Sequence, residues 1–341
     1  MSESAILIWG AGAIGGTLGA WWARAGHDIA FVDVDADHVD AMKRSGLRIE
    51  GPIDTFQVPV RAMLPEEVAG TYRRILLCVK AHHTEKATVS LAAHLAPDGY
   101  VASFQNGLNE LVIAEIVGAQ RTLGAFINFG ADYLSPGVIH YGGHGAFVVG
   151  ELDGRLTPRL QELHELGLEF EPGAILTDNI MGYLWGKLGY GALLFATALT
   201  NASICDALAA PEPRRLYRRI AGETVEVARS LGMRPIGFNG YDPAAFGREA
   251  TDVVADASFQ AMVAHNARSA KTHSGIWRDL AVRKRQTEAD AQLGPIVTFA
   301  RQQGLRAPTV EALIGMVHEI EQGRRPLAWE NLAELDRRTS R

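Results

Sequence analysis

The segment that most constrains the fold of this chain is Gly10-Ala11-Gly12-Ala13-Ile14-Gly15, which directly follows the short apolar run Ala5–Trp9. The run is typical of a buried strand, and a helical pattern continues beyond the glycines to Ala25. A Gly-x-Gly-x-x-Gly turn between a strand and a helix is typical of dinucleotide binding. Its glycines permit a tight turn, close approach of a pyrophosphate and close packing of the helix on the strand. We therefore predict that the six residues of this glycine loop contact a dinucleotide at the helix N-terminus, where N–H groups attract phosphates.

An acidic residue, Asp33, ends the next apolar run, Ile29–Val32. A carboxylate at this point can accept hydrogen bonds from the adenosine ribose hydroxyls and would repel a 2′-phosphate. The loop that follows adds Asp35 and Asp37, and the chain has no Lys or Arg from Asp28 to Met42. We therefore expect NAD(H) to be favoured over NADP(H) as the cofactor.

The order of patterns along the chain predicts two domains. Apolar runs at 29–32, 74–79 and 100–104 alternate with helical patterns, which indicates a parallel sheet covered on both faces. From 124 to 151, Gly-rich, β-branched and aromatic residues predict short antiparallel strands, and beyond Thr177 the pattern is almost wholly helical. A chain of 341 residues is also too long for one ordinary core. We expect an α/β Rossmann-type dinucleotide-binding domain over 1–176 and an all-α domain over 177–341.

Charge and composition exclude several classes of partner. A formal net charge of −6 offers no basic field for nucleic acid. Met1–Ser4 carry no basic residue, so we expect no secretory leader, and the apolar stretch Leu188–Leu199 is shorter than the roughly 20 residues of a membrane span. Two cysteines, Cys78 and Cys205, cannot build a disulfide framework or a zinc site. We expect a cytoplasmic protein with no metal, no membrane and no nucleic acid among its partners. Whether the chain forms a homodimer is left open.

Four segments, in order, resemble the ketopantoate reductase family (2-dehydropantoate 2-reductases and their relatives). They are the glycine loop, Leu77-Cys78-Val79-Lys80-Ala81, Gln105-Asn106-Gly107-Leu108 and Leu184-Trp185-Gly186-Lys187-Leu188. A fifth segment, Arg285-Gln286-Thr287-Glu288-Ala289-Asp290, resembles the acidic motif near the family's C-terminus. The resemblance extends from Ile6 to about Leu313, nearly the whole chain. It implies an NAD(P)-dependent oxidoreductase.

On the cofactor side, the resemblance implies a group of residues at the ends of two strands. Lys80, preceded by Val79, matches a lysine that lies beside the cofactor, and Asn106 matches an asparagine near the nicotinamide and the substrate. His83 stands where the family often has a glutamine, and both cofactor contact and a bystander role stay open for it. General physical reasoning agrees, because ligands of open α/β sheets bind outside the carboxyl ends of the strands.

On the substrate side, the resemblance implies that Lys187 is the general acid and that Glu288 contacts the substrate. Ser274 resembles a serine that helps to bind the substrate carboxylate, and Tyr190 is expected on or near the same face. Lys187 lies in an apolar helical pattern, where an ammonium is costly unless it is paired or reaches a cleft. A lysine that merely snorkels to the surface is the alternative. For Glu288 the alternative is a surface ion pair with the basic residues at 283–285.

The lysine helix departs from the family pattern at the positions that follow Lys187. Family members carry two asparagines, one and two turns beyond the lysine, whereas this chain has Gly191 and Phe195 (or Leu194) there. None of these side chains can hydrogen-bond. We therefore expect a remodelled substrate pocket, a bulkier or more apolar substrate, and poor use of ketopantoate. Three glycines on one stripe of the same helix (182, 186 and 189) predict close packing against a neighbouring segment.

Together these residues predict hydride transfer between a nicotinamide and a small 2-oxo or 2-hydroxy acid, with Lys187 as general acid/base and with Asn106 and Glu288 positioning the substrate. Two alternatives stay open. A β-hydroxyacid dehydrogenase, acting on a 3-hydroxy acid or a sugar acid, also combines a Rossmann domain, a helical domain and a lysine. An NAD(H)-binding sensor would keep the glycine loop and lose the chemistry, but the presence of both Lys187 and Glu288 favours an enzyme.

Overall fold

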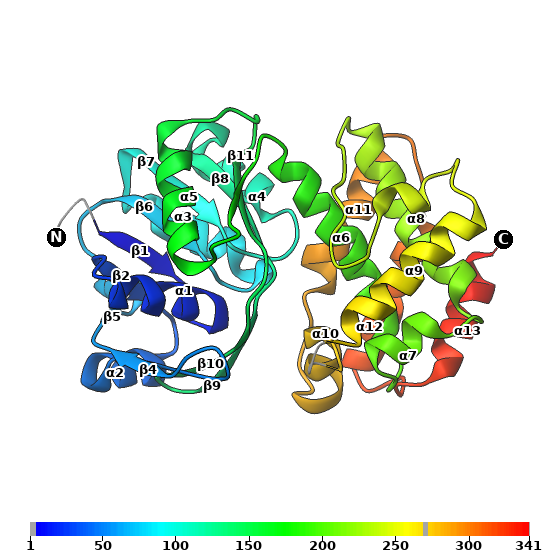
Figure 1. Ribbon diagram of the computed structural model, residues 1–341, viewed down its shortest axis with the longest axis horizontal. Helices are drawn as coiled ribbons and strands as arrows, with labels where there is room; N and C mark the ends of the chain where they lie inside the picture. Colours follow the sequence, from blue (N-terminus) through cyan, green and yellow to red (C-terminus); the bar gives the residue numbers. More distant parts are fainter. Residues whose placement is uncertain (1–4, 269–271, 341) are drawn as a thin grey trace. The chain divides into compact units, whose positions relative to one another are not determined.

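The computed structural model describes residues 5–268 and 272–340 of the chain. The chain forms two compact units, Met1–Ile180 and Met181–Arg341 (Figure 1). The division falls one residue inside helix α6 (Ile180–Thr197), so nearly all of this helix belongs to the second unit. Met1–Ser4, where we expect no leader, lie outside the described residues.

The first unit is built on an eight-stranded sheet with the order β12-β11-β8-β7-β6-β1-β2-β5. From β8 to β5 all neighbouring strands pair in parallel, and the chain moves outward from β1 in both directions. The point beside β1 where the strand order reverses is where open α/β sheets bind their ligands. The eight strands are β1 (Ile6–Trp9), β2 (Ile29–Val32), β5 (Arg61–Met63), β6 (Tyr72–Leu77), β7 (Leu95–Ser103), β8 (Thr122–Ile127), β11 (Phe147–Glu151) and β12 (Ile175–Leu176).

Both faces of this sheet are buried, as predicted. Ile6 and Ile8 of β1 belong to one apolar cluster with residues of α1, α2 and α5, whereas Leu7 and Trp9 belong to a second cluster with residues of α3 and α4. Side chains alternate between the faces of a strand, so a strand buried on both faces must be apolar throughout. The helices and single turns of the unit are α1 (Ala13–Arg24), α2 (Ala36–Ser45), η1 (Pro65–Glu67), η2 (Ala81–His83), α3 (Thr84–Ala92), α4 (Asn109–Val117), η3 (Ala119–Arg121) and α5 (Pro158–Phe170).

A second, four-stranded sheet has the order β4-β3-β10-β9. It consists of β3 (Leu47–Glu50), β4 (Phe56–Val58), β9 (Gly130–Ser135) and β10 (Val138–Gly143). The expectation of antiparallel strands over 124–151 is right for the β9–β10 and β8–β11 pairs. It is wrong for β8 against β7, β10 against β3 and β11 against β12, which pair in parallel. For β8 the reason is that α4 and η3 form a crossover from β7, which returns the chain in the same direction.

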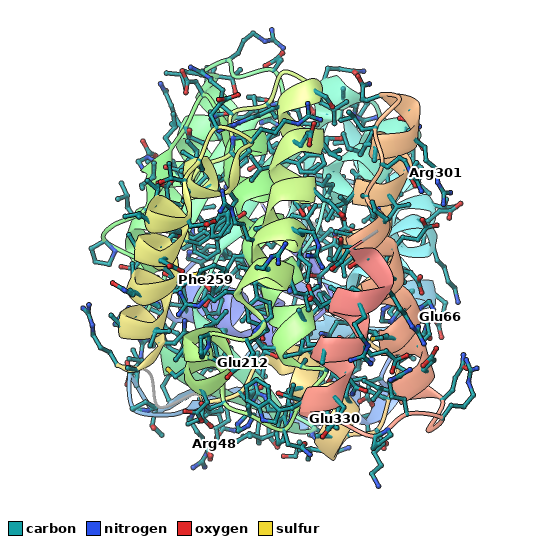
Figure 2. The ribbon with its side chains drawn as sticks, turned by 90° about the vertical axis from the view of Figure 1, so that its right-hand side faces the viewer. Arg48, Glu66, Glu212, Phe259, Arg301 and Glu330 are labelled. Carbon is teal, nitrogen blue, oxygen red and sulfur yellow. The ribbon has the colours of Figure 1, made fainter. Side chains whose placement is uncertain are left out.

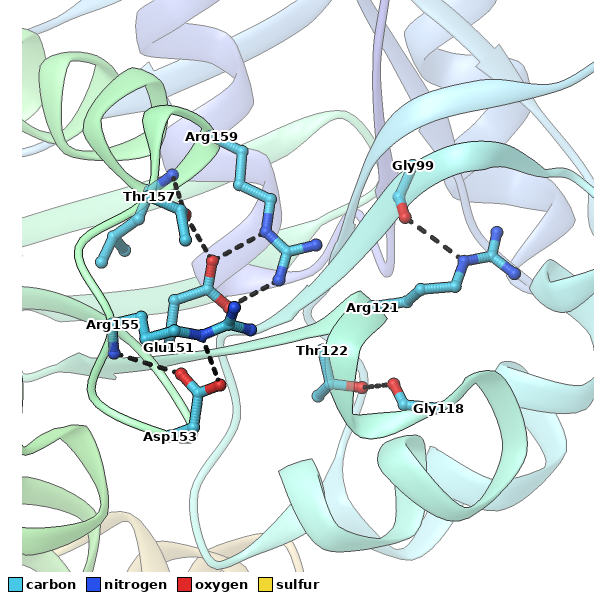
Figure 3. A network of polar contacts seen from close by, with 10 residues as sticks. Gly99, Gly118, Arg121, Thr122, Glu151, Asp153, Arg155, Thr157 and Arg159 are labelled. Carbon is cyan, nitrogen blue, oxygen red and sulfur yellow. Dashed lines mark hydrogen bonds and ion pairs between the residues drawn. The ribbon is translucent and has the colours of Figure 1, made fainter.

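The edge of the main sheet opposite the carboxyl ends of its parallel strands holds a network of charged groups (Figure 3). Glu151, which is only 2% exposed, accepts hydrogen bonds from the hydroxyl of Thr157 (2.5 Å) and from Nε (2.7 Å) and Nη2 (2.5 Å) of Arg159. Arg121, just before β8, donates to the carbonyl of Gly99 at 3.3 Å. These contacts join the start of α5 to the end of β11 and hold neighbouring strands together.

The second unit is helical. Its longest amphipathic helix, α8, contacts α11, α12 and α13 and carries a buried face that includes Leu216, Tyr217 and Ile220. Phe259 extends from α9 towards α8, where its ring lies 6.2 Å from that of Tyr217 (Figure 2). The helices and turns are α6, α7 (Ile204–Ala209), α8 (Arg214–Ser230), η4 (Pro243–Phe246), α9 (Asp252–Asn266), α10 (Gly275–Trp277), η5 (Arg278–Val282), α11 (Ala289–Gln302), α12 (Pro308–Glu321) and α13 (Trp329–Thr339).

Candidate active site

The glycine loop connects β1 to α1 in a turn that only small residues can form. Gly10 has a φ of 103°, and a Cβ on it would lie 2.8 Å from the backbone nitrogen of Val79. A Cβ on Gly15 would lie 2.8 Å from Cγ2 of Ile8 and still closer to the carbonyl oxygen of Gly10. Gly12 differs, because in the described part of the chain no atom outside its two chain neighbours lies within 4 Å of a Cβ built on it. This open side at the start of α1 is the geometry that the pyrophosphate of a dinucleotide needs.

Asp33 lies at the end of β2 and is tied to the glycine loop. Its Oδ2 accepts a hydrogen bond from the backbone N–H of Ala11 at 2.8 Å, and its Oδ1 accepts one from the N–H of Asp35 at 3.0 Å. The half-buried carboxylate is therefore held in place beside the turn. A carboxylate fixed there lies where the adenosine ribose of a dinucleotide is bound in Rossmann domains.

His38, which the sequence analysis did not single out, locks the same loop from the other side. It is buried, its Nε2 lies 2.9 Å from the carbonyl oxygen of Ala11, and its Nδ1 accepts a hydrogen bond from the N–H of Gly137 at 2.9 Å. These partners require Nε2 to carry the proton, so the ring is a neutral bridge between the glycine loop and the β9–β10 turn. Nearby, burial and the carboxylate of Asp35 raise the pKa of Tyr133 to about 12. Only the tertiary fold brings these groups together.

The other predicted cofactor residues lie at the same edge of the main sheet. Val79 and Lys80 follow β6, His83 ends the turn η2, and Asn106 follows β7; Lys80, His83 and Asn106 are exposed. Because β7, β6, β1 and β2 are neighbours in the parallel part of the sheet, their carboxyl ends meet at one edge. The fold therefore gathers these residues at the edge that carries the glycine loop and Asp33.

A buried polar cluster around Gln105 holds two of these loops together. The side-chain amide of Gln105 donates to the carbonyl of Val79 (2.9 Å) and to the hydroxyl of Thr84 (2.8 Å). Asn109 in turn donates to the carbonyl of Asn106 at 2.6 Å. Gln105 therefore fixes the backbone on either side of Lys80 and next to Asn106. In the sequence, the only signal for Gln105 is that it directly precedes Asn106.

In the second unit, Lys187 belongs to the accessible stripe of an otherwise buried helix. Within α6 the partly exposed residues are Tyr183, Lys187, Gly191 and Leu194, which lie three or four positions apart and so share one face. The residues next to Lys187 are apolar and buried. Trp185 is 2% exposed, and the centre of its ring lies 6.1 Å from that of Phe299. The helix thus directs the ammonium to its one open face.

The predicted packing role of the three glycines in α6 is confirmed. A Cβ on Gly186 would collide with the backbone of Ile236, and the N–H of Ile236 donates to the carbonyl of Gly182 at 2.9 Å. A Cβ on Gly189 would collide with the hydroxyl of Tyr241. These glycines let the 236–241 segment pack directly on the helix backbone, and Lys187 lies on a neighbouring stripe.

Glu288 lies at the N-terminus of α11 and is 9% exposed. The residue before it, Thr287, donates its backbone N–H and its hydroxyl to the same oxygen of Glu321, each at 2.7 Å. The hydroxyl of Thr287 also accepts from the N–H of Ala289 at 3.2 Å. Glu321, on α12, therefore positions the start of α11 and with it Glu288.

Ser274 and Tyr190 are both buried in the second unit. The hydroxyl oxygen of Ser274 accepts a hydrogen bond from the N–H of Trp277 at 3.1 Å and so caps α10. The hydroxyl of Tyr190 accepts from the side-chain amide of Asn266 at 2.8 Å, and its ring packs 5.2 Å from that of Phe238. Phe195 is completely buried, so its ring fills the core of the unit.

Within 5–268 and 272–340 no three His, Cys, Asp or Glu side chains gather as metal ligands. No helix in the same ranges has the length and apolarity to cross a membrane.

The two units together define a class of protein. The first has the glycine turn, the acidic strand end and the gathered loops of a dinucleotide-binding domain. The second is a helical domain that carries a lysine on the open face of a buried helix. This is the class of NAD(P)-dependent oxidoreductases with an N-terminal Rossmann domain and a helical C-terminal domain.

Within that class, the chain belongs to the ketopantoate reductase family. The family model described as ketopantoate reductase PanE/ApbA matches residues 6–154, and the model of its C-terminal domain matches residues 179–321. The predicted family, fold class and enzyme class are therefore confirmed.

Individual relatives agree with this assignment. The 2-dehydropantoate 2-reductase of Mesorhizobium japonicum is 29% identical over 260 residues, which cover 69% of this chain and 79% of the relative. The 2-dehydropantoate 2-reductase of Archaeoglobus fulgidus is 26% identical over 325 residues, 95% of this chain and 100% of the relative. The ternary structure of D-mandelate dehydrogenase with NADH and anilino(oxo)acetate shares the fold, with a TM-score of 0.81 at 21% identity over 94% of this chain and 98% of that one. These relatives favour the 2-oxo acid interpretation over the β-hydroxyacid dehydrogenase alternative.

Proposed function

We propose that this protein reduces a 2-oxo acid to the 2-hydroxy acid with NADH, and that Lys187 is its general acid. The observation that carries the proposal is the position of Lys187 on the one accessible stripe of the apolar helix α6. It is also the only Lys or Arg between Arg159 and Arg214. An ammonium is expensive to keep in such surroundings, and a proton donor is what the reduction of a carbonyl requires.

A nicotinamide bound beside the glycine loop would supply the hydride for the carbonyl carbon of the substrate. Lys187 gives a proton to the carbonyl oxygen in reduction and takes it back in oxidation. Asn106 and Glu288 orient the substrate, and Ser274 contributes to binding its carboxylate. Tyr190, itself a residue of α6, holds this helix to the end of α9 through the side chain of Asn266. Val79, Lys80 and His83 contact the cofactor beside the glycine loop. The protein thus supplies orientation and proton transfer, and the cofactor supplies the redox chemistry.

Asp33 and its surroundings support NADH as the preferred cofactor. The carboxylate is fixed by the N–H groups of Ala11 and Asp35, so it cannot easily turn away from a ribose. A 2′-phosphate would meet this charge together with that of Asp35 and would find no Lys or Arg before Lys43. The two carboxylates would repel the negatively charged phosphate, and the phosphate would also lack a cationic partner in this segment.

The space beyond Lys187 supports a substrate with a wider side chain than that of ketopantoate. Gly191 lies one turn after Lys187, and apart from the nearby backbone of α6 a Cβ on it would meet, among the described residues, only Oε1 of Gln292 within 4 Å. D-mandelate dehydrogenase, whose ternary structure holds NADH and anilino(oxo)acetate, shares the fold, and mandelate carries a phenyl ring on its hydroxyl-bearing carbon. We propose a comparably wide 2-oxo acid, with ketopantoate a poorer substrate. The free thiols of Cys78 and Cys205 fit the cytoplasmic location that we propose.

A panel of acids tests this function against its alternatives. Linear and branched 2-oxo acids, ketopantoate, benzoylformate, 3-oxo acids and 3-hydroxy acids are each incubated with NADH, NADPH or NAD⁺, and the absorbance of the reduced nicotinamide is followed. We expect the highest kcat/KM for a bulky 2-oxo acid with NADH. Turnover confined to 3-hydroxy acids would support a β-hydroxyacid dehydrogenase, and tight NADH binding without any turnover would support a sensor.

A further inference from the structure

A charged groove lies at the edge of the main sheet opposite the loops that carry the predicted cofactor residues. It has a volume of about 540 Å³ and lies within the first unit, between β6, β7 and the start of α5. Its walls carry four arginines and two carboxylates, namely Arg73, Arg74, Arg155, Arg159, Asp98 and Glu162. The chain as a whole has a formal net charge of −6. A groove with more arginines than carboxylates on an acidic protein attracts an anion.

The charges at the rim of the groove are paired with each other or with a neighbour. Arg73 bonds Asp98 at 3.0 Å, and Arg155 bonds Asp153 at 2.7 Å. All four side chains are more than half exposed. Exposed pairs of this kind contribute little energy, so the inner wall decides what the groove binds.

The inner wall places two guanidinium groups beside Tyr100. Arg74 of β6 is the register partner of Tyr100 of β7, so both side chains lie on the same face of the sheet. Arg159 comes from α5, and its Cζ lies 5.9 Å from the centre of the Tyr100 ring. The bonds from Arg159 to Glu151 use Nε and Nη2, two of the three nitrogens of its guanidinium (Figure 3).

Tyr100 is buried with its hydroxyl unsatisfied. The residue is 3% exposed, and among the described residues the hydroxyl oxygen has no hydrogen-bond partner. Burial raises the pKa of this hydroxyl, and the charged groups that act on it are Arg74, Glu162, Arg159 and Glu151. The hydroxyl therefore lies at the charged side of its ring, towards the groove. A buried hydroxyl without a partner is costly, and a ligand in the groove would supply the missing partner.

We propose that this groove binds the phosphate group of a small molecule. The site goes beyond the proposed function, because it lies at the opposite edge of the sheet from the glycine loop. Its donors are the hydroxyl of Tyr100 and the guanidinium groups of Arg74 and Arg159, which come from three different elements. A phosphate group offers three strong acceptor oxygens that point in different directions, whereas a carboxylate offers two in one plane. The positive end of α5, which starts at the groove, adds to the attraction.

Isothermal titration calorimetry tests the site with three probes: inorganic phosphate, glycerol 3-phosphate and succinate. Each probe is titrated into the full chain with and without saturating NADH, because the glycine loop also attracts phosphates. Tyr100→Phe deletes only the hydroxyl, and Arg74→Gln deletes the charge. The matched controls are Tyr217→Phe, at another buried hydroxyl without a partner among the described residues, and Arg44→Gln, at an exposed position of α2.

We expect inorganic phosphate or glycerol 3-phosphate to bind with an affinity that NADH does not change. Tyr100→Phe and Arg74→Gln should each weaken this binding at least about 10-fold, the value of one hydrogen bond to a charged group, and the controls should not. Tighter binding of the ester would identify a phosphate ester as the ligand, and tighter binding of inorganic phosphate would identify the free ion. Because the hydroxyl of Tyr100 has no partner among the described residues, Tyr100→Phe should unfold at the same urea concentration as wild type.

Four outcomes would overturn the inference. They are no binding of either phosphate, binding that NADH abolishes, binding that survives both Tyr100→Phe and Arg74→Gln, and succinate binding as tight as that of phosphate. A lower urea midpoint for Tyr100→Phe would show that its hydroxyl has an internal partner and would also contradict the site. None of these measurements depends on turnover, so the reductase proposal and this inference succeed or fail separately.

Discussion

At the scale of single residues, Lys187 and Asp33 show how the surrounding residues hold a charged group in one direction. The hydrophobic neighbours of Lys187 leave its ammonium only one open direction, along the stripe that also contains Gly191. Asp33 is held by two backbone N–H groups, so its charge faces a fixed point beside the glycine loop. Both residues can therefore be tested by changes that leave the fold in place.

Replacing Lys187 by methionine should remove the proton donor while keeping the length and the apolar stem of the side chain. A general acid contributes about 10²–10⁴-fold to rate, so we expect kcat to fall at least about 100-fold. Affinity for NADH, measured by fluorescence titration, should change little, because the glycine loop and Asp33 belong to the first unit. Lys86→Met, at an exposed position of α3, serves as the control. A folded Lys187→Met protein with near-normal turnover would exclude the role.

Replacing Asp33 by serine together with Val34→Arg should shift the cofactor preference towards NADPH. Val34 is 80% exposed, so an arginine there can reach a 2′-phosphate without disturbing the core. We expect the ratio of kcat/KM for NADPH to that for NADH to rise at least about 10-fold, the size of one charge-assisted contact. Asp37→Ser, in the first turn of α2, should leave the ratio unchanged. An NADPH preference in the wild type would contradict the proposed role of Asp33.

At the scale of elements, the candidate site depends on loops that follow parallel strands and on the groups that hold these loops still. The loops after β6 and β7 are joined by Gln105, and the glycine loop is joined to the β9–β10 turn by His38. Neither side chain needs to touch a ligand. Their effect is to fix the backbone that presents Lys80 and Asn106, and preorganised loops bind more tightly because less freedom is lost.

Gln105→Leu should therefore weaken both stability and cofactor binding. The change leaves the carbonyl of Val79 and the hydroxyl of Thr84 without their donor, at a cost of about 1–3 kcal/mol in the free energy of unfolding. We expect KM for NADH to rise several-fold and kcat to change less. The loops after β6 and β7 become less ordered, whereas the surroundings of Lys187 do not change. Gln120→Leu, at an exposed position in η3, is the matched control. If urea unfolding and KM match the wild type, Gln105 does not hold the loops.

At the scale of the whole molecule, two units with separate cores share one chain, so unfolding is not expected to follow a single two-state transition. The second unit is closed by its C-terminal helix, α13. Asn331 donates from α13 to the carbonyl of Leu199 at 2.9 Å, and Arg325 bonds Glu319 of α12 at 2.6 Å and Glu334 of α13 at 2.8 Å. The attachment of α13 therefore depends on a partly buried ion-pair network.

This network predicts how acid affects the second unit. Hydrogen bonds from Arg325 lower the pKa of Glu334 in the folded state. A carboxyl with a lowered pKa contributes stability above its unfolded-state pKa and loses this contribution as the pH falls through the folded-state pKa. We expect Glu334→Gln to lower the free energy of unfolding by about 1 kcal/mol or less near neutral pH and by progressively less in acid. Urea titrations across the pH range measure this difference, with Glu330→Gln on the same helix as the control. A difference that does not vary with pH would show that the effect is not electrostatic.

The sequence by itself determined the dinucleotide turn, the Rossmann and helical fold classes and the family. These features depend on local patterns: glycines at fixed spacing between a strand and a helix, apolar runs alternating with amphipathic segments, and short motifs in a set order. The packing role of the glycines in α6 was readable for the same reason, because Gly182, Gly186 and Gly189 form one stripe at helical spacing. Local periodicity can be recognised from the order of residues alone.

Only the tertiary structure decided the features that depend on partners distant in sequence. The direction of β8 follows from its pairing with β7, and strand composition alone does not encode it. His38 contacts Gly137 across 99 positions, and nothing in the sequence near either residue indicates this bond. A side chain acquires its function from the groups that surround it, and for these residues the fold brings those groups from other parts of the chain.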